Sequence, residues 1–470
     1  MVRRIVHWTL CVCLWFAVVG CNAQSSNAGF QNIENDSLLL VDIDTSYAFI
    51  RYDSNSLILG SDSSALRHFA EKWYHLLATG EGNINIVQLG ASHIQGGTFP
   101  HRVRRNLLIN FPNLVGPRGL IFPYSAAPKC NNPYDYKVSR SRALKLTRSV
   151  FKNPEEKLGL TGIAVTAADT ATDIGITLNE PSIHFETTRI ILLGYARGGV
   201  VPQLQITDAK GNQQTLSPQT IDTTLRRYTF QLEESVDSFH IVMPCKAGQA
   251  FVLTGVYLDN DKPGISYHSI GVNGASLVEY LQKSPYMVQD LKLLHPDLVI
   301  FGIGINDAVG ANFDTVVFQR RYMQLMDSIR LANPDCAFIF VTNNDSFRRV
   351  KRRYEVNPNG VMAREAFLRL GQKTGNAVWD QFTIMGGLNS MKVWQDNALA
   401  QRDHIHFTRK GYEMLGDLLT NALVKTLIAL KPAEYRTTQR TQDHRNKKEV
   451  TTPKENNEMN KNERSDYISY

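Results

Sequence analysis

The strongest constraint on the fold is an alternation of short apolar runs with segments of helical periodicity. Five runs have the length and β-branched content of buried strands, at residues 84–89, 265–270, 298–302, 337–342 and 376–379. Helical patterns lie at residues 62–78, 101–109, 278–295, 318–332, 361–373 and 411–430. This alternation predicts five parallel strands in one sheet, sandwiched between helices.

The segment from residue 125 to residue 263 has a different pattern. Short alternating runs are separated there by turn residues, for example at residues 204–207, 228–232 and 239–243, and few helical patterns occur. This pattern predicts a β-sandwich of about eight or nine strands. The α/β domain would then consist of residues 62–124 and 264–431, interrupted by an inserted β-domain.

The two ends of the chain show neither the α/β pattern nor the β-sandwich pattern. Arg3 and Arg4 precede an apolar run too short for a comfortable membrane span, and residues 18–21 resemble a bacterial lipobox. We therefore expect a lipoprotein signal peptide over residues 1–21, lipidation of Cys21 and a periplasmic, membrane-anchored protein; cleavage after Ala23 is the alternative. Residues 22–61 are expected to be an extension, and residues 432–470 a disordered polar tail.

Charge and cysteine content narrow the classes of partner. The net charge of +7 over 470 residues includes no concentrated arginine stripe, which argues against nucleic acid. Outside the leader, the three cysteines lack the paired short spacings of a zinc site, so we expect no metal. In an oxidising compartment Cys130 and Cys245 are candidates for a disulfide, and Cys336 in its apolar run is expected to be buried.

Ser92 lies where chemistry is expected in such a sheet. It follows the run at residues 84–89 through Gly90 and Ala91, and open α/β sheets bind ligands at the carboxyl ends of their strands. Taken alone, these residues are more typical of an ordinary strand-exit turn. Ile94 stands where the G-x-S-x-G motif needs its second glycine, so the nucleophile elbow of α/β-hydrolases is excluded.

Later segments place further polar residues at the same edge. Asn306 follows the run at residues 298–302, and Asp403 and His406 precede the last helical pattern. An aspartate three residues before a histidine can orient the imidazole while the other ring nitrogen faces a serine. Together with Ser92, these residues are the inventory of a serine hydrolase.

Four blocks of sequence resemble those of the SGNH, or GDSL, hydrolases. They are Gly90-Ala91-Ser92, Gly271-Val272-Asn273-Gly274, Gly304-Ile305-Asn306-Asp307 and Asp403-x-x-His406. They stand in the family's order, and the resemblance covers about residues 62–124 and 264–430. It implies a flavodoxin-like α/β/α sandwich.

The resemblance also implies a role for each matching residue. Ser92 would be the nucleophile, His406 the base and Asp403 its orienting acid, with an oxyanion hole formed by the N–H groups of Ser92 and Gly274 and the side chain of Asn306. No cofactor is implied. Ala91 departs from the family, which usually has aspartate there, so we expect a less firmly fixed serine loop and lower activity.

The position of the insertion, between Ser92 and Gly274, further resembles bacterial peptidoglycan O-acetylesterases and related O-acetyltransferases. In those proteins a carbohydrate-binding-like β-domain interrupts the catalytic domain. The implied function is removal of O-acetyl groups from a cell-envelope or other polysaccharide through an acyl-enzyme, with an acetylated glycan as partner. The alternatives are an O-acetyltransferase served by a membrane-bound acetyl donor and a noncatalytic glycan-binding lipoprotein.

Several residues near these blocks carry lesser expectations. His93 is expected to fix the serine loop, His404 to be exposed and Asp307 to cap a helix start. The insertion contains no tryptophan, which leaves three tyrosines as possible sugar-stacking residues or core residues: Tyr195, Tyr228 and Tyr257.

Overall fold

A computed structural model describes residues 40–109, 111, 114–128, 130, 132–178, 183–208 and 210–436. These residues belong to one compact unit. The expected signal peptide, Cys21 and residues 437–470 lie outside the described residues. Among the described helices, none is both long and apolar enough to span a membrane.

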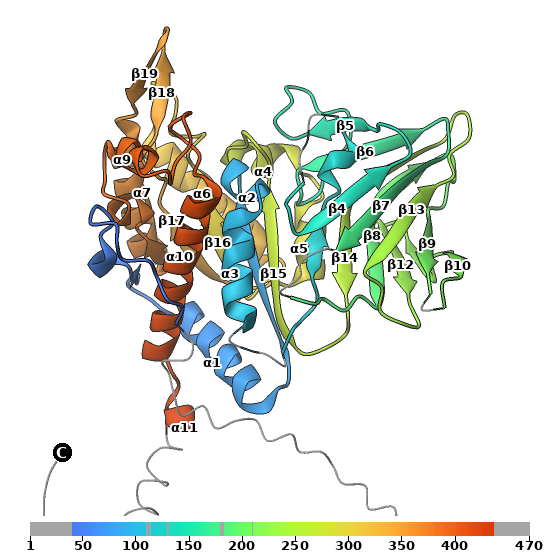
Figure 1. Cartoon of the computed structure of the whole chain (residues 1–470), viewed down its shortest axis with the longest axis horizontal. Helices are drawn as coiled ribbons and strands as arrows, with labels where there is room; N and C mark the ends of the chain where they lie inside the picture. The colour runs from blue at the N-terminus through green and yellow to red at the C-terminus, as the bar shows by residue number, and fades with distance from the viewer. Residues whose placement is uncertain are drawn as a thin grey trace, which may run out of the picture. The chain divides into compact units, whose positions relative to one another are not determined.

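The central sheet has six strands rather than the expected five (Figure 1). Their order is β1 (Leu57–Ile58), β20 (Ala377–Trp379), β17 (Ala337–Val341), β16 (Leu298–Gly302), β2 (Asn83–Gly90) and β15 (Gly264–Gly271). The last five run parallel, and β1 pairs antiparallel with β20. Numbered by position in the chain, the parallel strands stand in the order 2-1-3-4-5, which places the topological switch point between β2 and β16.

The sixth strand comes from the segment that we expected to be an extension. The side chain of Leu57 in β1 is buried, and Asn55 links two distant parts of the core. Trp379 Nε1 donates to Asn55 Oδ1 at 2.9 Å, and Asn55 Nδ2 donates to the carbonyl of Leu418 at 2.9 Å. A two-residue strand is too short for any periodicity, so the sequence could not show it.

Helices cover both faces of the sheet. One core cluster joins strand residues such as Ile84 and Ile86 to α1 (Ser64–Thr79), α3 (Thr98–Ile109) and α10 (Arg409–Ala429). Another joins Val87 and Leu89 to α4 (Leu277–Lys283), α5 (Met287–Leu294), α6 (Thr315–Arg330) and α7 (Asn359–Thr374). The strand therefore buries both of its faces, as parallel sheets require.

The helix expected at residues 278–295 is two helices. Pro285 lies between α4 and α5. Because proline lacks an amide hydrogen and disfavours helical backbone at the residue before it, α4 ends at Lys283. Because the apolar periodicity continues across Pro285, the sequence pattern indicated a single helix.

The inserted segment forms two antiparallel sheets, of five and seven strands. Eleven of these strands lie within residues 125–263: β4 (Tyr136–Arg140), β5 (Lys145–Arg148), β6 (Ile163–Ala168), β7 (Thr172–Leu178), β8 (Arg189–Arg197), β9 (Gln203–Thr207), β10 (Gln213–Leu216), β11 (Thr220–Asp222), β12 (Arg227–Gln231), β13 (Ser238–Met243) and β14 (Ala250–Asp259). The twelfth, β3 (Gly119–Ile121), precedes the expected insertion and pairs antiparallel with β14 in the larger sheet. The structure thus contains more strands than expected. The extra ones include β10 and β11, whose side chains are mostly exposed and so show no apolar alternation.

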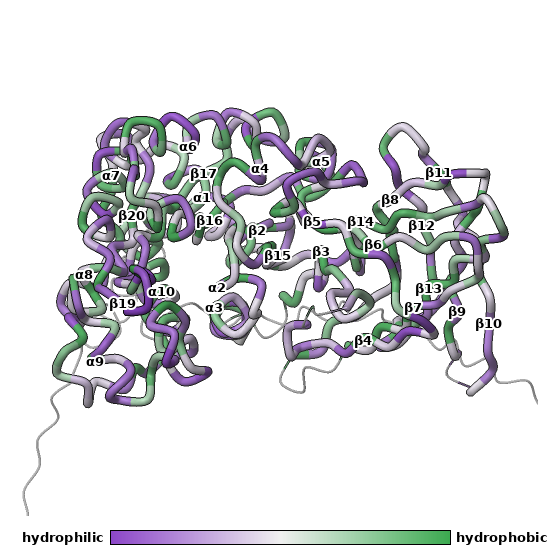
Figure 2. Tube along the Cα trace, turned by 90° about the horizontal axis from the view of Figure 1, so that it is seen from above, coloured by the Kyte–Doolittle hydropathy of each residue, from purple (hydrophilic) through white to green (hydrophobic). Residues whose placement is uncertain are grey.

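The insert shares its core with the α/β part. The cluster that contains α4 and α5 continues into β8 and β14. Figure 2 shows α5 between α4 and the strands of the insert. Arg226 of the insert donates to Asp290 of α5 at 2.7 Å, with both side chains almost fully buried, and its guanidinium carbon lies 3.7 Å from the ring centroid of Tyr286. The backbone N–H of Leu160 also donates to Asp290, at 2.8 Å.

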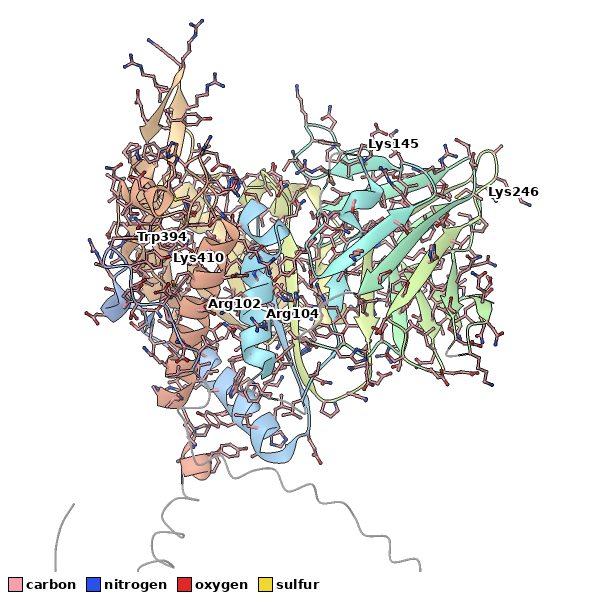
Figure 3. All side chains as sticks on the ribbon, viewed as in Figure 1. Arg102, Arg104, Lys145, Lys246, Trp394 and Lys410 are labelled. Atoms are coloured by element: carbon pink, nitrogen blue, oxygen red, sulfur yellow. The ribbon has the colours of Figure 1, made fainter. Side chains whose placement is uncertain are left out.

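Charged side chains of α3 link the same two regions. Arg104 donates to Asp135 at 3.0 Å on the side of α3 that faces the insert (Figure 3). Arg102 pairs instead with Asp417 of α10, with 2.6 Å between Nε and Oδ1. Helix α3 is therefore fixed on both sides by ion pairs.

The expected disulfide between Cys130 and Cys245 is wrong, because both are buried free thiols. Cys245 Sγ donates to the carbonyl of Ala167 at 3.5 Å. A disulfide requires a narrow range of Cα separations, which two isolated cysteines in a sequence cannot reveal. Cys336 is fully buried, as expected.

Short elements at the carboxyl ends of the strands complete the fold. They are α2 (Ser92–Gln95), the hairpin β18 (Phe347–Val350) and β19 (Arg353–Val356), α8 (Gln381–Ile384) and α9 (Ser390–Asp396). Helix α11 (Ala433–Arg436) follows α10, within the segment that we expected to be disordered.

Candidate active site

Three residues from distant parts of the chain form a hydrogen-bonded relay. Ser92 Oγ lies 2.7 Å from His406 Nε2, and His406 Nδ1 lies 2.7 Å from Asp403 Oδ2. Ser92 is the first residue of α2, and the other two lie in the loop before α10. The structure therefore brings together the serine, histidine and aspartate singled out in the sequence, in the geometry in which the histidine can take the serine proton.

Asp403 is fixed by the loop that carries it. Its Oδ1 accepts from the backbone N–H groups of Ile405, at 3.0 Å, and His406, at 2.9 Å. Burial opposes the charged form, but these hydrogen bonds and the one to the His406 ring outweigh it and hold the pKa of Asp403 below its usual value. The carboxylate therefore stays ionised at neutral pH and can orient the imidazole.

Ser92 is positioned by close backbone contacts at the ends of three adjacent strands. A Cβ atom on Gly90 would lie 2.6 Å from the carbonyl oxygen of Gly302, so only glycine fits there. Gln95 of α2 accepts from the backbone N–H of Asn273 at 2.7 Å, which ties the serine loop to the loop after β15. The nucleophile is thus held from two sides.

The expected oxyanion donors surround this loop. Gly274 has φ = +84°, a conformation that favours glycine, and no hydrogen bond among the described residues uses its N–H or that of Ser92. Asn306 Nδ2 donates to the carbonyl of Ala275 at 2.8 Å, which places this amide beside the Gly274 loop. One amide hydrogen is engaged in that bond, and the other is left for a ligand.

Ala91 does not leave the serine loop without support. Its methyl group is buried, and its carbonyl accepts from the N–H groups of Ile94, at 3.1 Å, and Gln95, at 2.9 Å. Together with the Gln95 side chain, these bonds hold the loop in the absence of an aspartate. The lower activity that we expected from Ala91 stays a prediction.

His93 lies behind the relay and pairs with a tyrosine that the sequence did not indicate. Its Nδ1 is 2.7 Å from the hydroxyl of Tyr412 on α10, and its ring centroid is 5.1 Å from that of His406. Burial, together with the nearby His406, lowers the pKa of His93 to about 3. His93 is therefore neutral at physiological pH and braces the serine loop against α10.

His404 is half-buried, not exposed as expected. Its backbone has φ = +57°, and its ring stacks on Phe347 of β18 with centroids 4.6 Å apart. The N–H of Phe347 donates to the His404 carbonyl at 3.1 Å, and Asn344 Nδ2 donates to the carbonyl of Ile405 at 3.0 Å. The loop after β17 thus holds the loop that carries Asp403 and His406, a contact that depends on tertiary structure alone.

Asp307 lies at a helix start, as expected, but the helix is α4, which precedes it in the chain. It accepts from the N–H of Leu277, the first residue of α4, at 3.2 Å. Burial is the main cause that raises the pKa of Asp307 to about 7. Its place beside Asn306 connects the asparagine block to α4.

The three tyrosines singled out in the insert do not form a stacking surface. Tyr228 and Tyr257 are buried, and the hydroxyl of Tyr195 donates to Glu156 at 2.8 Å. These rings belong to the core or to its polar edge.

Residues 253–414 match the GDSL-like Lipase/Acylhydrolase family, which supports an acyl hydrolase. Among solved structures, a peptidoglycan O-acetylesterase resembles the chain with a TM-score of 0.63 and 19% identity, over 79% of this chain and 99% of the other. An acetyl xylan esterase has a TM-score of 0.28 and 16% identity, over 34% of this chain and 81% of the other. For a family two carbohydrate esterase from Clostridium thermocellum the TM-score is 0.25 and the identity 11%, over 60% and 99%.

Only the first of these likenesses is close enough to inform the fold. No curated protein matches the sequence. The family match includes Asn306, Asp403 and His406, and the likeness to the peptidoglycan O-acetylesterase extends over most of the chain. The chain therefore resembles the SGNH, or GDSL, hydrolases and has their fold, and its residues 253–414 match the model of the GDSL-like lipase/acylhydrolase family.

Proposed function

We propose that this protein is a serine esterase that removes O-acetyl groups from a polysaccharide. The observation that carries the proposal is the relay from Ser92 through His406 to Asp403, with 2.7 Å at each step. A noncatalytic glycan-binding protein has no need of a serine hydroxyl hydrogen-bonded to an aspartate-oriented imidazole. The likeness to a peptidoglycan O-acetylesterase supports the choice of substrate class.

The reaction would proceed in two halves through an acyl-enzyme. His406 Nε2 takes the proton of Ser92 as Oγ attacks the acetyl carbonyl, and Asp403 stabilises the imidazolium that forms. The N–H groups of Ser92 and Gly274 and the Asn306 amide would bind the developing oxyanion. The histidine then gives its proton to the departing sugar oxygen. A water molecule, deprotonated by His406, releases acetate and restores the serine.

Hydrolysis is favoured over acetyl transfer by the openness of the relay. The side chains of His406 and Asp403 are 32% and 41% exposed, so bulk water reaches the base that would activate it. A transferase must keep water from that intermediate. No membrane-bound acetyl donor is needed for the proposed reaction. Lipidation at Cys21 and a periplasmic location stay predictions.

The decisive test is acetate release by purified protein from acetylated peptidoglycan and acetylated xylan, beside hydrolysis of an aryl acetate. Ser92→Ala should lower turnover on the order of a millionfold, because the members of such a relay act as a unit. Ser328→Ala, at a half-buried serine of α6 whose hydroxyl donates to the carbonyl of Gln324, is the matched control and should be as active as wild type. Equal aryl acetate hydrolysis by Ser92→Ala and Ser328→Ala would overturn the proposal. Acetate appearing on an added sugar, and not in solution, would indicate a transferase.

A further inference from the structure

The hairpin β18–β19 carries a concentration of cations beside the candidate active site. It leaves the carboxyl end of β17 and projects from the sheet at the end where α2 lies (Figure 1). Five of the seven residues from 348 to 354 are cationic: Arg348, Arg349, Lys351, Arg352 and Arg353. Long, nitrogen-tipped side chains spread from it into solvent (Figure 3).

These charges are not neutralised by the protein itself. Within the part of the chain that the structure describes, none of the five cations forms an ion pair, and Glu355 is the only acid in either strand. Lys351 occupies the turn with φ = +54°, where glycine would be less strained. A hairpin whose only role was to turn the chain would need neither feature.

The pairing of the strands divides the hairpin into two faces. Opposite residues are Phe347 and Val356, Arg348 and Glu355, Arg349 and Tyr354, and Val350 and Arg353. Because side chains alternate, one face carries Phe347, Arg349, Tyr354 and Val356, and the other carries Arg348, Val350, Arg353 and Glu355.

The first face is turned toward the loop that carries the relay. Both of its aromatic rings approach His404, with centroids 4.6 Å away for Phe347 and 6.0 Å away for Tyr354. Arg349 shares this face with them and is exposed, and the Tyr354 side chain is 53% exposed. Two residues along a strand span about 7 Å, so Arg349 begins one such step beyond the contact with His404.

We propose that Arg349 and Tyr354 form a binding site for a carboxylate-bearing unit of the substrate glycan, with the carboxylate on the sugar itself or on a group attached to it. The site deepens the proposed function and rests on it. An exposed guanidinium binds a carboxylate through two parallel hydrogen bonds, and an exposed aromatic ring packs against the apolar face of a pyranose. Cross-strand neighbours lie about 5 Å apart at Cβ, so one sugar unit can contact both side chains. The glycan would then lie across the His404 loop with its acetyl group near Ser92.

An anionic membrane is the rival occupant of a basic surface, and the position of the aromatic residue argues against it. Lys351 and Arg352, at the tip, have no exposed apolar neighbour that would enter a lipid interface. The exposed ring of Tyr354 is on the face of the hairpin that is turned toward the His404 loop. The hairpin is therefore built to present a polymer to the site and not to lie on a bilayer.

The test compares two arginines of the same hairpin that lie on opposite faces. The measured quantity is the ratio of kcat/KM for acetylated peptidoglycan to kcat/KM for the same polymer with its carboxylates amidated. Arg349→Gln should lower this ratio about tenfold, which is the low end of the range for losing a hydrogen bond to a charged group. Arg353→Gln is the matched control and should leave that ratio within about twofold. Tyr354→Ala should lower kcat/KM for both polymers, and Tyr354→Phe should restore it. An equal ratio for Arg349→Gln and Arg353→Gln would overturn the proposal.

Binding without turnover separates this proposal from the proposed function. In a Ser92→Ala background, Arg349→Gln should weaken sedimentation with the acetylated peptidoglycan, whether or not the wild type releases acetate. Absence of acetate release with Arg349-dependent binding would refute the esterase alone. Acetate release that does not depend on Arg349 would refute the binding site alone. Equal losses for both arginine variants in binding to phosphatidylglycerol vesicles, without a change on glycan, would assign the hairpin to a membrane.

Discussion

Replacing Asp403 by asparagine tests the feature on which the candidate site depends most. The carboxylate accepts three hydrogen bonds, from the N–H groups of Ile405 and His406 and from the His406 ring. Asparagine keeps one oxygen for the two backbone donors but turns an NH2 group toward Nδ1. The ring nitrogen must then accept, so the imidazole proton moves to Nε2, where it blocks uptake of the serine proton.

The size of the effect follows from the burial of the pair. In a comparable relay, the same substitution at a buried aspartate lowers turnover about 10⁴-fold. Asp403 is 41% exposed, and water can replace part of the lost interaction. A hydrogen bond to a charged group contributes about 1.5 to 3 kcal/mol, or roughly 10-fold to 150-fold. We therefore expect Asp403→Asn to lower kcat by about 10-fold to 10⁴-fold.

The assay is aryl acetate hydrolysis across a range of pH, with the thermal midpoint measured on the same samples. Because the two backbone bonds are retained, Asp403→Asn should melt within a few degrees of wild type, whereas Asp403→Ala loses these bonds and should melt lower. If Asp403→Asn kept more than a third of the wild-type kcat, the aspartate would not orient the base and the reasoning would be refuted.

Other predictions follow from single contacts. Asn306→Ala should cost about 10² to 10³-fold in kcat as the loss of one oxyanion donor, measured on an aryl acetate; an unchanged kcat would remove it from the oxyanion hole. Burial raises the pKa of Asp307 from 3.8 to about 7, so this group's contribution to stability is greatest below the unfolded pKa and is lost as the pH rises through 7. The thermal midpoint should therefore fall between about pH 4 and about pH 8, and Asp307→Asn should make this fall smaller. Cys130 and Cys245 should both be alkylated in denaturant without reductant, and mass spectrometry showing them linked would contradict the structure. Replacing residues 125–263 by a short linker should give a protein that does not fold, as judged by circular dichroism, because the insert shares a core with the sheet.

The sequence by itself determined the parts of this protein whose causes are local. The apolar run at residues 298–302 coincides with β16, and the run at residues 265–270 lies one residue inside β15 at each end, because burial on both faces leaves a continuous apolar signal. The candidate site was visible for the same reason. Ser92 lies two residues after β2 and Asn306 four residues after β16, and the spacing of Asp403 and His406 within one loop is enough to join them.

Only the tertiary structure decided which distant residues meet. Asn55 and Trp379 are separated by 324 positions, and no sequence pattern near either residue indicates that they are in contact. The pairing of β1 with the sheet could therefore not be predicted. The stacking of Phe347 on His404 is of the same kind. Pairing across a fold depends on the packing of every element between the partners, whereas periodicity and loop spacing are properties of the chain itself. The packing of the hairpin against the His404 loop therefore had to come from the folded structure.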